Sequence, residues 1–145
     1  MQSARLSAHR NAVAPDGSDV RILVGGEGGS MAHFTLAPGE TSVAVAHRTL
    51  EELWYFTEGR GQFWRRPEST GDTECIDVEA GVAVAIPART HFQFRALGSE
   101  SLRAVAVTMP PWPGSGDLAG RGEVYFVDGP WEPTVPPGLD PEGAG

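Results

Sequence analysis

Short runs in which apolar and polar residues alternate recur along most of the chain. In EELWYFTE (residues 51–58), Glu52, Trp54 and Phe56 share one face of an extended backbone, and Tyr55 takes the other. Alternation with a period of two residues predicts β-strands. The predicted strands are residues 19–24, 30–36, 41–47, 51–58, 61–66, 73–78, 82–86, 91–96 and 102–109.

The segments between these strands are rich in residues that turn the chain, such as GGEGG, APGE, GRG and EAG. Nine short strands at this spacing are typical of a β-barrel or β-sandwich. The best candidate for a helix, residues 49–56, is rich in aromatic residues and ends at a Gly-Arg-Gly turn, which favours a strand. We therefore expect an all-β fold with few or no helices.

The length of the chain is that of one ordinary domain, since 145 residues can bury a self-sufficient core. The expected division is an N-terminal arm at 1–18, a β-barrel at 19–110 and a Pro- and Gly-rich extension at 111–145, with one further strand candidate at 125–127. Trp112 and Trp131 indicate that this extension packs on the barrel or on a second subunit, because free tails rarely carry large aromatic residues.

The acidic balance of the chain argues against nucleic acid and membrane surfaces as partners. Nineteen acidic and eleven basic residues give a formal net charge of −8, which repels phosphate backbones and anionic lipids. The N-terminal segment lacks the apolar stretch of a secretory signal, and the longest aliphatic run, 82–86, is too short to span a bilayer. The single cysteine, Cys75, fits a reducing compartment, so we expect a soluble cytoplasmic protein.

One stretch combines regular spacing with residues that can carry chemistry. Gly39 is followed after five residues by Val45 and, two positions on, by His47; Glu52 follows after four more residues, and Gly59 after another six. This spacing resembles the first cupin motif, G(X)5HXH(X)3,4E(X)6G. Valine occupies the position of its first histidine.

A second stretch resembles the second cupin motif, G(X)5PXG(X)2H(X)3N. Gly81 and Pro87 fit its first two positions. Arg89 stands at the glycine position, Phe92 at the histidine position and Ala96 at the asparagine position. The match is therefore one of spacing, with the second motif's histidine absent.

The resemblance covers residues 19–109 and implies a cupin-type, jelly-roll-like antiparallel β-barrel with an internal cavity. Cupins resemble one another in fold more than in activity, so the reaction stays open. Where the family's metal-ligand set resembles His-His-Glu-His, this chain offers Val45, His47, Glu52 and Phe92. Two protein ligands are fewer than the three that catalytic zinc and non-haem iron centres use.

Three interpretations of His47 and Glu52 stay open. The turn between their strands brings them close enough to bind one ion or to share one proton. If His91 points inward through a bulge, then His47, Glu52 and His91 form a triad for a divalent metal, with Fe, Mn, Ni and Zn as candidates. Without His91, the pair is an acid–base dyad or a buried structural pair.

Aromatic residues around the pair predict an apolar pocket. The expected lining residues are Val45, Trp54, Phe56, Phe92 and Phe94. The first functional hypothesis is a small organic ligand bound there and oriented by His47 and Glu52. The second is an enzyme: an isomerase, epimerase or cyclase that uses His47 and Glu52 in acid–base catalysis, or a metal-dependent oxygenase if His91 joins. The third is a barrel that serves mainly as a dimer module, and a homodimer is expected because open strand edges favour pairing.

Overall fold

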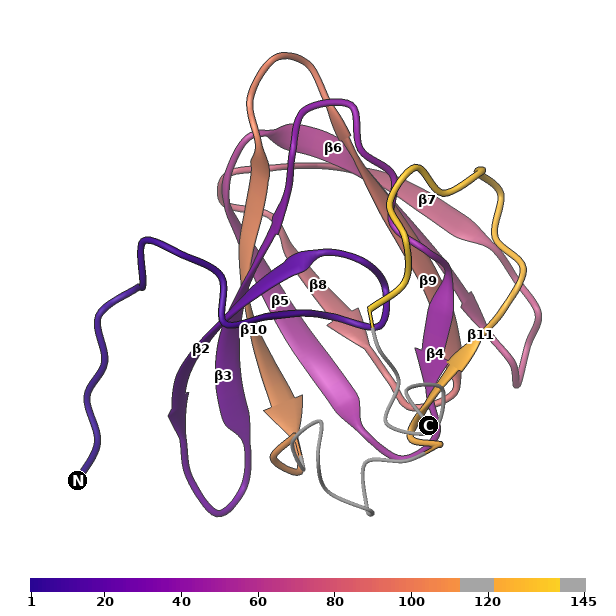
Figure 1. Ribbon diagram of the computed structural model, residues 1–145. Coiled ribbons are helices and arrows are strands. Elements are labelled where there is room, and N and C mark those ends of the chain that lie inside the picture. Colours follow the sequence, from indigo (N-terminus) through magenta and orange to yellow (C-terminus); the bar gives the residue numbers. More distant parts are fainter. Residues whose placement is uncertain (113–121, 139–145) are drawn as a thin grey trace.

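Two antiparallel β-sheets face each other across the core (Figure 1). The structure is a computed structural model that describes residues 1–112 and 122–138. The first sheet has the strand order β1-β2-β3-β10-β5-β8, and the second has the order β11-β4-β9-β6-β7. The strands are β1 (Ala12–Val13), β2 (Asp19–Gly25), β3 (Ser30–Leu36), β4 (Val45–His47), β5 (Glu51–Glu58), β6 (Arg60–Pro67), β7 (Glu74–Glu79), β8 (Ala83–Ile86), β9 (Thr90–Leu97), β10 (Leu102–Met109) and β11 (Val124–Phe126).

The all-β prediction is confirmed, and each of the nine predicted strands has a counterpart among β2 to β10. Hydrogen bonds do not close the two sheets into one continuous barrel. The strand predicted at 41–47 is shorter in the structure, where β4 begins at Val45. Before β4 the chain meets β9 through an isolated bridge at Thr41 and through Ser42, whose hydroxyl accepts from the Phe94 N–H at 3.0 Å. The described part of the chain contains no helix, and therefore none long and apolar enough to cross a membrane.

Aromatic rings that point inward from both sheets pack against one another within a largely aliphatic core. Alternation along β5 buries Trp54 and Phe56 and leaves Tyr55 53% exposed, as its sequence pattern predicts. Trp54 meets the ring of Phe94 edge to face at 5.1 Å, and Phe63 stacks on Phe92 at 5.7 Å. Pairs of this kind contribute about 1 kcal/mol each beyond simple burial. The Trp54–Phe94 pair joins the two sheets where hydrogen bonds do not, whereas Phe63 and Phe92 both belong to the second sheet.

The segment after the barrel packs against the outer face of β9. Gln93 is fully buried there, and its side-chain amide donates to the carbonyl oxygens of Ser42 and Trp131, at 2.8 Å each. The guanidinium of Arg95 lies over the Trp131 ring at 4.2 Å. The segment around Trp131 therefore covers part of the side of the second sheet that faces away from the aromatic core, while β11 extends that sheet by pairing with β4.

A positive φ explains one departure from the second cupin motif. Arg89, at the motif's glycine position, has a φ of 58°, in the left-handed region that glycine enters without steric cost. Its N–H donates to the His47 carbonyl oxygen at 2.7 Å, so this turn supports the end of β4. The backbone at Arg89 thus has a left-handed conformation that suits glycine, although arginine has a large side chain.

Replacing Arg89 by glycine should stabilise the protein. We expect Arg89→Gly to raise the free energy of unfolding by about 1 kcal/mol, because glycine removes the left-handed strain. The side chain that is lost makes only an exposed ion pair to Glu68 at 3.9 Å, which contributes little. Chemical denaturation measures the change, with Arg89→Ala as the control that removes the ion pair and keeps the strain. Equal effects of the two substitutions would contradict this account.

Candidate functional site

His47 and Glu52 meet where the chain passes from the second sheet to the first. His47 is the last residue of β4 and Glu52 the second residue of β5, so the short turn between them spans both sheets. Nε2 of His47 lies 2.6 Å from Oε1 of Glu52. The residues are 7% and 4% exposed, so the pair is almost completely removed from solvent.

The second oxygen of Glu52 is also occupied. The indole Nε1–H of Trp54 donates to Oε2 at 3.2 Å, from the same face of β5. A buried carboxylate is costly unless its oxygens have donors, and here each oxygen has one. The alternation of β5 therefore places both the carboxylate and one of its donors on the inner face.

Glu123 approaches the other side of the His47 ring. Its Oε2 lies 3.9 Å from Nδ1 of His47 and accepts from the backbone N–H groups of Thr49 and Leu50, at 2.9 and 3.2 Å. Nδ1 itself is buried and has no hydrogen-bond partner among the described residues. His47 thus lies between two carboxylates. Sequence reasoning missed Glu123 because it comes from the C-terminal extension, 76 positions after His47, and its only local signal is the strand candidate that follows it.

The surroundings of His47 favour its protonated form. Burial lowers the pKa of His47, but the charge of Glu52 and its hydrogen bond, followed by the charges of Glu123 and Asp16, outweigh burial and raise the pKa above 6.5. A raised folded-state pKa means that the contribution to stability is fully present below the unfolded value and is lost as pH rises through the folded value. The folded site therefore favours the imidazolium form of His47 more than the unfolded chain does.

Asp16 is a third buried carboxylate near the pair. It is 5% exposed, and its Oδ1 accepts from the N–H and the hydroxyl of Ser18, at 2.9 and 2.6 Å. Burial raises the pKa of Asp16 to about 6, although the Ser18 bonds oppose the shift, and the charge of Glu52 adds to it. Sequence reasoning missed this residue because it lies in the predicted N-terminal arm; the turn-forming run Asp-Gly-Ser was the available signal.

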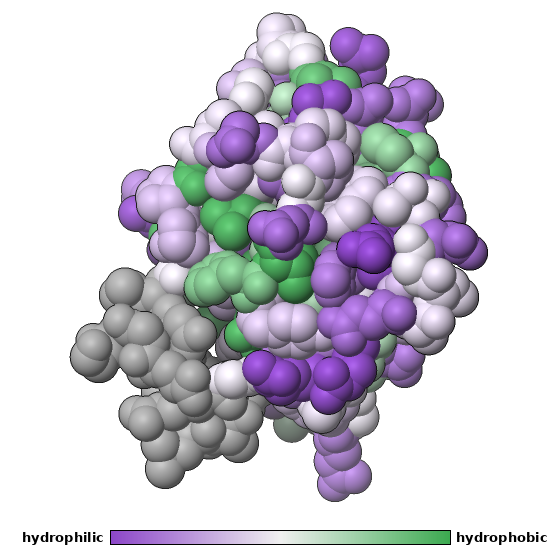
Figure 2. Space-filling view, turned by 90° about the vertical axis from the view of Figure 1, so that its right-hand side faces the viewer, coloured by the Kyte–Doolittle hydropathy of each residue, from purple (hydrophilic) through white to green (hydrophobic). Residues whose placement is uncertain are grey.

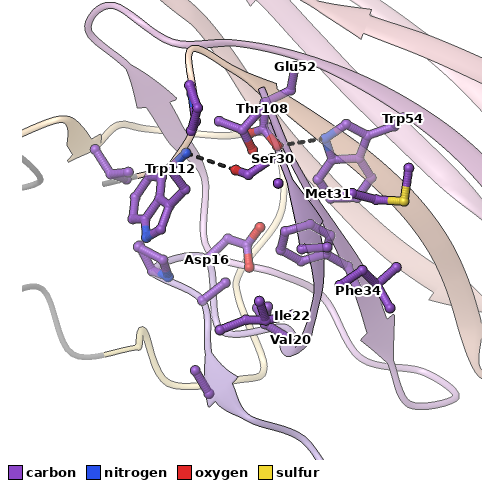
Figure 3. Close-up of a pocket in the computed structure, with 18 of the residues that line it drawn as sticks. Asp16, Val20, Ile22, Ser30, Met31, Phe34, Glu52, Trp54, Thr108 and Trp112 are labelled. Carbon is purple, nitrogen blue, oxygen red and sulfur yellow. Dashed lines mark hydrogen bonds between the residues drawn. The ribbon is translucent and has the colours of Figure 1, made fainter. Parts of the chain in front are cut away.

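Asp16, His47 and Glu52 lie at the wall of a cavity of about 470 Å3 (Figure 3). Most of the wall is apolar, and Phe34 stacks on Trp54 within it at 4.8 Å. The Trp112 ring meets the His47 ring edge-on at 5.9 Å. The polar or ionisable residues among the described lining are Gln2, Asp16, Ser30, His47, Glu52 and Thr108.

Three of the five residues that the sequence predicted for the pocket line it, and two lie elsewhere in the core. Val45, Trp54 and Phe92 line the cavity. Phe56 and Phe94 do not: they are 0% and 1% exposed in the core, because they lie further along the same strand faces, beyond the end of the cavity. Val45 and Phe92 are direct Cα partners between β4 and β9. The two motif positions that lack histidine therefore form one apolar pair beside His47.

His91 does not join His47 and Glu52. Its Nε2 lies 2.8 Å from Oε2 of Glu68, which also accepts from the Tyr125 hydroxyl. The register of β9 keeps Phe92 and Phe94 inward, so His91 lies on the opposite face of that strand. The triad of His47, Glu52 and His91 considered from the sequence is therefore not assembled.

The donor set does not fit a metal ion held by three protein ligands. Over residues 1–112 and 122–138, no group of three or more His, Cys, Asp or Glu side chains is placed to hold one. Nε2 of His47 faces a carboxylate directly, and the neighbouring Val45 and Phe92 carry no donor atoms. A metal ligand must also be deprotonated, which the raised pKa of His47 opposes.

Comparison with known proteins agrees with the fold and the spacing of the motifs. The sequence pattern described as "Cupin domain" matches residues 32–108, which is more than half of the chain. The chain belongs to the cupin family. An uncharacterized protein of Methanocaldococcus jannaschii is 29% identical to this cupin over 105 residues, which cover 69% of this chain and 79% of the relative.

Solved structures similar to this cupin include enzymes. A recombinant oxalate oxidase in complex with glycolate has a TM-score of 0.65 and 21% identity, over 86% of this chain and 62% of that one. The oxalate decarboxylase of Bacillus subtilis has a TM-score of 0.59 and 17% identity, over 68% of this chain and 27% of that one. A protein of Bacillus halodurans has a TM-score of 0.58 and 22% identity, over 70% and 74%. At these identities the likeness concerns the fold, and this cupin spans only about a quarter of the decarboxylase chain.

The proton on His47 can be measured directly. We expect NMR titration of the His47 ring to give a midpoint above 6.5, and Glu52→Gln to lower it, because burial then acts with less opposition. Glu68→Gln is the matched control, since it alters the separate His91–Glu68 pair. A midpoint that stays unchanged in Glu52→Gln would show that the pair is not coupled.

Proposed function

We propose that this cupin binds a small organic molecule in the cavity, with a polar group of the ligand near His47 and Glu52. The observation that carries the proposal is the cavity itself: about 470 Å3, mostly apolar walls, and one buried charged pair at its wall. A concave apolar site with a few fixed polar groups is the usual form of a small-molecule site. The apolar pair of Val45 and Phe92 supports the proposal, because it adds apolar surface where the family motif has histidines.

A divalent metal, whether Fe, Mn, Ni or Zn, is the competing occupant. Oxalate decarboxylase, a structural neighbour, has Mn(II) centres. In this chain His47 and Glu52 already pair with each other, and His91 pairs with Glu68 on the other face of β9. The metal-dependent oxygenase is therefore the weaker alternative, and the steps proposed here use no metal.

The acid–base enzyme is the second candidate, and the raised pKa of His47 favours it. Glu52 holds the proton at Nε2, while Glu123 faces Nδ1 and Asp16 adds a third negative charge. A histidine in this setting can supply a proton to a bound substrate and recover it afterwards, as an isomerase, epimerase or cyclase requires. We place this activity in the cytoplasm, because the lone Cys75 fits a reducing compartment; cell fractionation would test that location.

Binding can be tested with benzyl alcohol, a neutral probe that fits the cavity. We expect it to raise the melting temperature of the full chain by a few degrees at about ten times its Kd, which corresponds to about 1.4 kcal/mol. In NMR spectra the Trp54 indole N–H should shift, because Trp54 lines the cavity, while Trp131, outside it, should not.

Filling the cavity should abolish this response. Ala32 lines the cavity from β3, so Ala32→Phe should remove both the thermal and the NMR shifts. Ala80→Phe, the same substitution at an exposed turn, is the control and should respond like the wild type. If Ala32→Phe still binds benzyl alcohol with unchanged spectra, the cavity is not the binding site.

We also propose that the protein forms a homodimer through the outer face of its first sheet. Leu53 and Tyr55 are 51% and 53% exposed there, on a strand in the interior of the sheet. The side of the molecule that bears β7 and β11 shows many hydrophilic residues (Figure 2). Large apolar side chains grouped on one sheet face are typical of surfaces that another subunit covers.

Sedimentation equilibrium tests the dimer. We expect Leu53→Glu to shift the population to monomers, because it places a charge in the middle of the proposed interface. Leu97→Glu alters another exposed leucine, on the second sheet, and should leave the dimer intact. A monomeric wild type at micromolar concentration would refute the proposal.

A further inference from the structure

Among the described residues around the cavity, one carboxylate has no oppositely charged partner of its own. The ionisable side chains among the described lining residues are Asp16, His47 and Glu52, with no lysine or arginine. His47 and Glu52 form a close pair and largely cancel each other's charge. Asp16 therefore gives the cavity a net negative charge when it is ionised.

Asp16 presents one free oxygen to the cavity. Both of its bonds from Ser18 end on Oδ1. Within the part of the chain that the structure describes, Oδ2 receives no hydrogen bond, and no basic side chain forms an ion pair with the residue. The side chain is more than nine-tenths buried, and Figure 3 shows its carboxylate directed into the space that Trp112 and Phe34 border.

The backbone around Asp16 holds this orientation. The Asp16 carbonyl oxygen accepts from the Val43 N–H at 2.8 Å, and the Gly17 N–H donates to the Ala14 carbonyl oxygen at 2.8 Å. Gly17 has a φ of 89°, and a Cβ there would collide with Val135. The loop is thus fixed between the sheet and the C-terminal segment, and it cannot turn the carboxylate to solvent without losing these contacts.

An unpaired buried carboxylate is unfavourable at neutral pH. Burial and the charge of Glu52 raise the pKa of Asp16 to about 6, so near pH 7.5 the group is ionised at a free-energy cost. A cation in the cavity would remove this cost. The aromatic faces of Phe34, Trp54 and Trp112 would also attract a cation.

We infer that the cavity takes an apolar molecule that carries a protonated amine, and that the amine pairs with Oδ2 of Asp16. This assignment rests on the proposed binding function and names its ligand class. A ligand carboxylate would face Asp16 and Glu52 without a free cation among the described lining residues. Anionic ligands are therefore selected against, and neutral ones bind without the contact to Asp16.

Three probes with the same ring test the assignment: benzylamine, benzyl alcohol and benzoate, titrated calorimetrically at pH 7.5 into the full chain. We expect benzylamine to bind about tenfold more tightly than benzyl alcohol, the gain of one charge-assisted contact, and benzoate to bind most weakly. Asp16→Asn keeps an oxygen for the Ser18 bonds and removes the charge. It should erase the preference for the amine over benzyl alcohol. Asp72→Asn, at an exposed turn, is the control.

The outcomes separate the two proposals. If benzoate binds wild type as tightly as benzylamine, or if Asp16→Asn keeps the preference for the amine, the amine assignment is overturned while cavity binding stands. If none of the three probes binds, the proposed function fails, and the assignment fails with it. The comparison of probes on wild type remains decisive even if Asp16→Asn does not fold.

Discussion

The contact between His47 and Glu52 is the constraint on which the rest of the site depends. A carboxylate this deeply buried needs a partner, and the imidazole 2.6 Å away provides it. Because β4 belongs to one sheet and β5 to the other, the same contact also ties the sheets together at the turn between them. Glu123 completes the arrangement by capping this turn and facing the second ring nitrogen. Removing the proton from His47 would leave a cluster of buried negative charge.

The apolar pair beside this contact decides which chemistry the site supports. Val45 and Phe92 face each other across β4 and β9, where the cupin motifs place histidines. Without those donors, His47 and Glu52 hold a proton between them, and the neighbouring space becomes a largely apolar cavity. The same barrel that holds Mn(II) in a structural neighbour here offers aromatic walls and fixed carboxylates. This difference in side chains underlies our proposal that the cavity binds an organic molecule.

The sequence predicted what depends on local spacing. Alternation placed Trp54 inward and Tyr55 outward, and the motif spacing singled out His47 and Glu52 before their contact was known. Alternation defines which face a side chain takes but not how far along the cavity it lies, so Phe56 and Phe94 were expected on the wall and are in the core instead. The positions of Asp16 and Glu123 could not be predicted, because contacts between distant parts of the chain set them. Asp16 lies in a loop that hydrogen bonds tie to residues 43 and 138, and Glu123 lies in the segment after the barrel.

We propose that the buried pair of His47 and Glu52 is complete with a proton and needs no metal. Its most direct test is the metal content of the untagged full chain, incubated with Mn(II), Fe(II), Ni(II) or Zn(II), desalted and measured by mass spectrometry. We expect far less than one equivalent of any metal, with no change in His47→Ala. One tightly bound equivalent that His47→Ala abolishes and His91→Ala retains would contradict it.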